Sequence, residues 1–85
     1  AELMNIAPNP VVNGRFDLKI STAEKTNMEL LITDMQGRLV QKRPVTMIAG
    51  FNTIPMNVSN LAAGTYQLFV NTADGRTRVL RFVIQ

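Results

Sequence analysis

The chain has 85 residues, of which 46% are hydrophobic and 18% are charged, and its formal net charge is +3. This length suits a single domain, and the composition favours a folded domain because enough apolar surface can be buried. Cysteine and histidine are both missing, which excludes disulfides, zinc–thiolate sites and Ser–His or Cys–His catalysis.

The N-terminal part predicts two strands separated by an irregular segment. Residues 3–6 form a short candidate strand, which "APNP" at 7–10 stops because proline cannot donate to a strand ladder. We expect 7–10 to be an extended or turning edge segment. The "NG" at 13–14 marks a turn, and the alternation of polar and apolar side chains over 15–20 then predicts a half-buried strand.

The middle of the chain continues with short strands and turns. Residues 27–33 resume the alternation, and "DMQG" at 34–37 has the aspartate and glycine of a type I turn. The next strand begins directly afterwards, and Pro44 predicts a bulge or a change of sheet. Pro55 favours an edge strand, and residues 57–61 are predicted to form a single helical turn.

Residues 64–85 predict one β-hairpin that continues, ordered, to the last residue of the sequence. Polar and apolar side chains alternate over 65–71 and again over 79–84, which places an apolar row on each strand. The "DG" at 74–75 is the turn signal, because a short Asx side chain and glycine tolerate positive φ angles.

These elements predict an all-β fold, an immunoglobulin-like antiparallel β-sandwich of about seven strands with no long helix. The expected core consists of apolar side chains from the alternating rows. They are Phe16, Leu18, Ile20, Met28, Leu30, Ile32, Leu39, Ile54, Leu61, Tyr66, Leu68, Val70, Leu80 and Phe82.

The polar residues do not predict a catalytic, metal or nucleic-acid site. The six carboxylates are scattered, without calcium-loop or paired spacing, so we predict no enzyme activity, no metal and no cofactor. Nucleic-acid binding is not expected, because most aromatic residues lie in predicted core rows and cannot stack on bases. No stretch approaches the roughly 20 apolar residues of a membrane helix, so we expect no direct membrane insertion.

Four segments, in order, carry a resemblance: "PNP" at 8–10, "DMQGRLV" at 34–40, "LAAGTYQLFV" at 61–70 and "RTRVLRFVIQ" at 76–85. In this order and spacing, the sequence resembles the type A C-terminal sorting domain of the type IX (Por) secretion system. The resemblance implies that residues 1–85 are a single domain, the secretion signal of a larger exported protein in a diderm bacterium.

The resemblance also implies partners and a route. The cargo would cross the periplasm, pass through the outer-membrane translocon, and reach the cell surface or the medium. A cell-surface signal peptidase would usually remove the domain, and the cargo would be released or joined to lipopolysaccharide.

In such proteins the terminal hairpin is closely tied to recognition. The residues that the resemblance assigns to the translocon are Gly64, Tyr66, Leu68, Val70, Arg76, Arg78, Val79, Arg81 and Val83. The motif residues with an expected structural role are Pro8, Asn9, Pro10, Asp34, Gly37 and Gly75. For the three arginines, a solubilising surface and a receptor contact are both open interpretations. Many family members end in lysine-rich strands, and arginine keeps that charge.

Two other functions compete with secretion. One is a generic fibronectin-like accessory or carbohydrate-binding module of a secreted enzyme, although the absence of tryptophan and the single tyrosine disfavour a sugar-binding platform. The other is self-association, in which two copies exchange an edge strand and form a homodimer.

Overall fold

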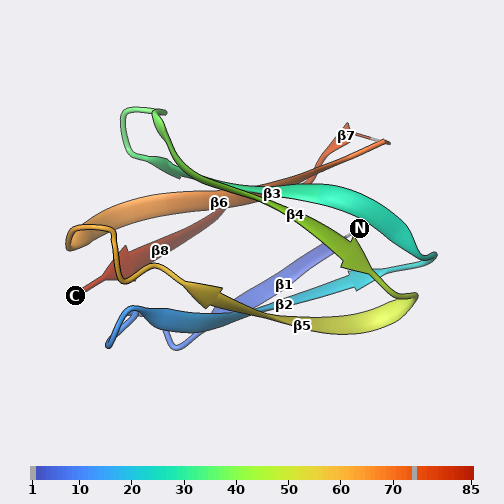
Figure 1. The fold of residues 1–85 in the computed structure, drawn as a ribbon, viewed down its shortest axis with the longest axis horizontal. Coiled ribbons are helices and arrows are strands. Elements are labelled where there is room, and N and C mark those ends of the chain that lie inside the picture. The colour runs from blue at the N-terminus through green and yellow to red at the C-terminus, as the bar shows by residue number, and fades with distance from the viewer. Residues whose placement is uncertain (1, 74) are drawn as a thin grey trace.

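The computed structural model describes residues 2–73 and 75–85, and the side chains of all of these except residues 3 and 4. Two antiparallel sheets pack face to face as a sandwich (Figure 1). The strands are β1 (Glu2–Ala7), β2 (Arg15–Thr22), β3 (Thr26–Asp34), β4 (Leu39–Met47), β5 (Gly50–Asn57), β6 (Gly64–Thr72), β7 (Gly75–Arg76) and β8 (Leu80–Ile84). The predicted all-β sandwich is confirmed.

The lower layer in Figure 1 is a three-stranded sheet with the order β1-β2-β5. The other sheet has the order β4-β3-β6-β7, and β8 also pairs with β6. The predicted terminal hairpin is present, but its second arm is divided into β7 and β8, which raises the strand number above seven. The Asp74 part of the expected turn lies outside the described residues. No helix that could cross a bilayer occurs in the described part of the chain.

Most of the predicted core is confirmed. The predicted residues that are buried are Phe16, Leu18, Ile20, Met28, Leu30, Ile32, Ile54, Tyr66, Leu68, Val70 and Phe82. Leu61 and Leu80 are only partly buried against this cluster. The cluster also contains side chains that alternation did not identify, namely Val11, Met47, Met56 and Val58.

The prediction for Leu39 was wrong, since its side chain is 52% exposed. Ile32 pairs with Gln41, but Thr33 pairs with Leu39, so Val40 is an extra residue in the ladder. This bulge moves Leu39 to the outer face, because a shift of one residue reverses which face a side chain occupies.

Pro44 causes neither a bulge nor a change of sheet, contrary to the prediction. It lies within β4 and pairs with Glu29, on a strand that forms the edge of its sheet. An edge strand tolerates proline because the missing N–H can face away from the ladder. The chain changes sheet after Met47, in the turn before β5, and β5 is an edge strand as Pro55 predicted.

The predicted helical turn at 57–61 is also wrong. The N–H of Leu61 donates to the carbonyl of Val58 at 2.9 Å, and the N–H of Ser59 donates to Asn57 Oδ1 at 2.9 Å. The segment is therefore a β-turn preceded by an Asx turn. The N–H of Val58 donates to the carbonyl of Gly14 at 2.7 Å, which holds the turn against the loop before β2.

Candidate binding surface on the C-terminal strand

The last strand, β8, is part of the packed core. It pairs with β6 from Gly64 opposite Ile84 to Leu68 opposite Leu80. The ring of Phe82 is fully buried, with its centroid 5.0 Å from that of Phe16 and 5.8 Å from that of Tyr66. Ring contacts at these distances add to the stabilisation by burial, so β8 is held firmly on the sandwich.

Residues 8–11, which we call the strap, cover the other backbone edge of β8. The N–H of Val11 donates to the carbonyl of Val83 at 2.7 Å, and the N–H of Gln85 donates to the carbonyl of Val11 at 3.0 Å. The N–H of Val83 donates to Asn9 Oδ1 at 3.1 Å. Residues 83–85 therefore lie between β6 and the strap, which leaves little of their backbone for another strand.

The side chains of the hairpin divide into an inward row and an outward row. Tyr66, Leu68 and Val70 are buried, so in the folded domain they support the strand from inside. The side chains of Arg81 and Val83 lie opposite Gln67 and Thr65 on the outer face, where both are exposed. The outer face is thus the part of the hairpin that another molecule can contact.

The alternation of the second arm is interrupted between β7 and β8. Residues 77–79 face only 69–70 on β6, because Asn71 pairs with Arg76 and Leu68 pairs with Leu80. The N–H of Thr77 donates to the carbonyl of Val70 at 2.9 Å, and the Thr77 hydroxyl accepts from the N–H of Val70 at 3.0 Å. This bulge is closed by its own hydrogen bonds.

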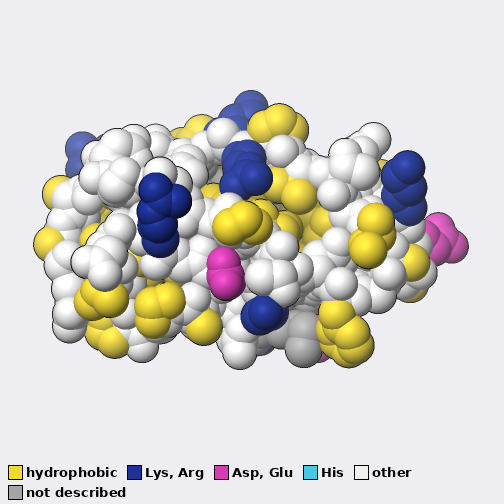
Figure 2. Space-filling view, turned by 60° about the horizontal axis from the view of Figure 1, so that its bottom comes forward, with side chains coloured by type: hydrophobic (Ala, Val, Ile, Leu, Met, Phe, Trp, Pro, Cys, Tyr) yellow, Lys and Arg dark blue, Asp and Glu magenta, His cyan; other side chains and the backbone are white. Residues whose placement is uncertain are grey.

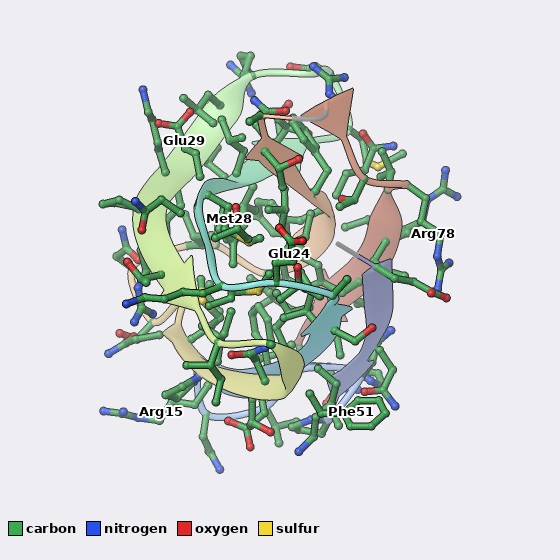
Figure 3. All side chains as sticks on the ribbon, turned by 90° about the vertical axis from the view of Figure 1, so that its right-hand side faces the viewer. Arg15, Glu24, Met28, Glu29, Phe51 and Arg78 are labelled. Carbon is green, nitrogen blue, oxygen red and sulfur yellow. The ribbon has the colours of Figure 1, made fainter. Side chains whose placement is uncertain are left out.

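The bulge separates the three arginines that the sequence places in one row. Arg76 lies over the ring of Phe69, with its guanidinium carbon 4.3 Å from the ring centroid. Arg78 and Arg81 instead both line a groove between β1 and β8, and Figure 3 shows the Arg78 side chain on the outside of the sandwich. Arg76 is therefore set apart from Arg78 and Arg81, and the three arginines do not form one continuous row.

This geometry agrees with the comparison to known proteins. The sequence profile of the secretion system C-terminal sorting domain family matches residues 5–85. The chain belongs to this family. No curated protein matches the sequence.

Membership confirms the resemblance and the expected function. The sorting domain is a non-catalytic secretion signal for a cargo, and it works with the Por secretion machinery. It implies export across the outer membrane of a diderm bacterium. Residues 2–73 and 75–85 contain no group of three metal-ligating side chains. On the face of the sorting domain in Figure 2, the Lys and Arg side chains lie apart from one another.

The turn motif of the sorting domain has a structural role near the chain end. Asp34 Oδ1 accepts from the N–H groups of Gln36 and Arg38, and Oδ2 accepts from Arg38 Nε at 2.7 Å. Desolvation acts to raise the pKa of the Asp34 carboxyl, but these hydrogen bonds and the Arg38 charge outweigh it and lower the pKa. Gly37 has a φ of 85°, which favours glycine at this position of the turn.

Two further glycines were among the predicted residues, Gly64 for translocon recognition and Gly75 for a structural role. Gly64 is exposed at the start of β6 and lies opposite Ile84, next to the chain end. The hydroxyl of Tyr66 donates to the carbonyl of Ala62 at 2.7 Å, which fixes the loop that leads to Gly64. Gly75 has a φ of 120° and pairs with Thr72, so it closes the hairpin at the opposite end.

Proposed function

We propose that the outer-membrane translocon reads this sorting domain through the outward face of its C-terminal hairpin. A receptor can read a terminal hairpin by adding a strand to its edge or by contacting its face. The strap supports the second mode, because strand addition at 83–85 would first have to displace the hydrogen bonds of Asn9 and Val11.

Within this proposal the hairpin residues have different roles. The contact surface consists of the exposed residues Gly64, Arg76, Val79, Arg81 and Val83. Arg78 adds charge at the groove between β1 and β8, which Arg81 also lines. Tyr66, Leu68 and Val70 give the strand its shape from inside the core. Charged side chains on such a surface steer the encounter and select the partner more than they add affinity.

Membership of the family supports the proposed route. Residues 1–85 are one domain at the C-terminal end of a larger exported protein, which crosses the periplasm and is delivered to the cell surface or the medium. A cell-surface signal peptidase then removes the domain from the cargo. The two sheets share one buried core, which suits a domain that is recognised and then cleaved away.

The test is export of a periplasmic reporter fused to this domain, in a cell that carries the translocon. Arg81→Gln should reduce delivery to the surface several-fold, whereas Arg15→Gln, an exposed arginine on the other sheet, should not. A short polar extension beyond Gln85 should also block delivery, because the chain end lies beside the contact face. Equal delivery of the unchanged fusion, the two variants and the extended protein, each shown to be folded by circular dichroism, would contradict the proposal.

A homodimer formed by exchange of β8 is a separate proposal for the assembly state. Exchange would keep the pairing of β6 with β8 and would need the chain to open at 77–79, where the ladder is already interrupted. Sedimentation of the purified domain measures whether this dimer forms.

A further inference from the structure

The start of β1 and the C-terminal residue Gln85 lie toward opposite ends of the sandwich. Figure 1 shows the start of β1 and the chain end far apart along the longest axis, along which the domain extends 35 Å. The strap and the turn at Asp34 lie near the C-terminal end. The β2–β3 and β4–β5 turns lie at the end where β1 begins.

Two exposed apolar side chains, which we call the apolar tip, lie at the end where β1 begins. Phe51 is 78% exposed and Ile48 is 64% exposed, more than any other described large hydrophobic side chain. Figure 3, which looks onto this end, shows the Phe51 ring pointing away from the sandwich. Covering the Phe51 ring and the Ile48 side chain would remove apolar surface from water, which favours a contact at this end.

The turn that carries the apolar tip is well ordered. Asn52 Oδ1 accepts from the N–H of Ile48 at 3.1 Å, and Asn52 Nδ2 donates to the carbonyl of Ile48 at 3.0 Å. The same nitrogen donates to the carbonyl of Gly50 at 3.2 Å. Because one side chain fixes both ends of the turn, Ile48 and Phe51 are presented in a defined arrangement.

The chain enters the domain next to Phe51. Glu2 pairs with Ser21, and Ser21 pairs with Phe51, so these three positions share the outer face of the three-stranded sheet. Neighbouring strands lie about 4.8 Å apart, which places the Glu2 and Phe51 backbones roughly 10 Å from each other. A segment that continues β1 backwards therefore passes within reach of the phenyl ring.

We propose that the apolar tip is a docking site for the segment that directly precedes Ala1 in the exported protein. This inference rests on the proposed function, which places the cargo before this domain. The segment would cover Phe51 and Ile48 with apolar side chains of its own. Docking at this end orients the cargo away from the C-terminal strand and leaves the face of the hairpin accessible.

The experiment uses the whole exported protein and measures hydrogen exchange in the ten or so residues before Ala1. Phe51→Ser should speed this exchange by roughly tenfold, because burying a phenyl ring stabilises the docked state by about that factor in its equilibrium constant. Leu39→Ser is the control, since Leu39 is also a large, exposed apolar side chain but lies at the opposite end of the sandwich. Exchange that is the same in the Phe51→Ser protein and the parent would overturn the proposal.

Two further measurements separate this inference from its alternatives. If Phe51→Ser converts a dimer into a monomer and leaves exchange before Ala1 unchanged, the apolar tip binds a second copy and the proposal is wrong. Export of the same variants is measured in parallel. Faster exchange in Phe51→Ser together with normal export of Arg81→Gln would support docking and contradict the recognition proposal. Unchanged exchange in Phe51→Ser together with reduced export of Arg81→Gln would contradict docking and support the recognition proposal.

Discussion

The side-chain oxygen of Asn9 accepts a hydrogen bond from the backbone N–H of Val83, which lies 74 residues later in the chain. The "PNP" motif thus contacts the strand that carries the chain end. Asn9→Ala should cost about 1 kcal/mol, the usual net contribution of one hydrogen bond. In a domain of this size that lowers the Tm by roughly 4–8 °C.

Thermal unfolding followed by circular dichroism measures this change, with Asn60→Ala as the control at an exposed asparagine. Amide exchange should also increase at Val83 in the Asn9→Ala domain. A melting curve identical to that of the Asn60→Ala domain would show that the bond does not contribute to stability.

The inward row of β6 should dominate stability. Leu68 is fully buried, and Leu68→Ala should destabilise the domain by about 2–5 kcal/mol, because it removes buried methyl groups and leaves a cavity. Leu39→Ala should change stability by less than about 0.5 kcal/mol, since Leu39 is on the surface. Urea unfolding of both variants measures the difference, and equal midpoints would contradict the assigned core.

The Asp34 turn should make stability depend on pH. The pKa of Asp34 in the folded domain lies below its ordinary value of 3.8, so the folded state binds fewer protons than the unfolded chain. Its stabilising contribution is present above pH 3.8 and is lost as the pH falls through the folded value. Tm measured against pH should fall less steeply in this range for Asp34→Asn, and parallel curves would argue against the assignment.

Two glycines separate a steric effect from backbone strain. Gly14 and Gly37 both have positive φ angles, of 69° and 85°. A Cβ on Gly14 would lie 2.7 Å from Ser59 Cα, whereas one on Gly37 would meet nothing within 4 Å. Gly37→Ala should cost about 1–2 kcal/mol for the backbone alone. Gly14→Ala should cost clearly more free energy of unfolding, because the backbone at Ser59 would have to move. Urea unfolding of both variants measures the two costs, and equal costs would show that the loop at Ser59 adapts freely.

The sequence predicted the strands whose side chains alternate, and it predicted which face of the terminal hairpin points outward. Val83 and Phe82 are examples, since one is exposed and the other buried as the alternation requires. Local patterns could not predict the strap, because Asn9 and Val83 are far apart in sequence and no periodic pattern of side chains links the two segments. The extra residue at Val40 reversed the face of Leu39, because a bulge depends on the partner strand.

The last prediction separates the structural role of the arginines from their proposed recognition role. Arg76→Ala should cost about 0.5–1 kcal/mol, since it removes the cation–π contact with Phe69. Arg81 is exposed, and the described residues include no hydrogen bond or ion pair of its side chain, so Arg81→Ala should leave the Tm unchanged. If the translocon reads charge on this face, both variants should lose export. Loss of export in Arg81→Ala at an unchanged Tm therefore assigns that arginine to recognition, and retained export would leave it as a solubilising residue.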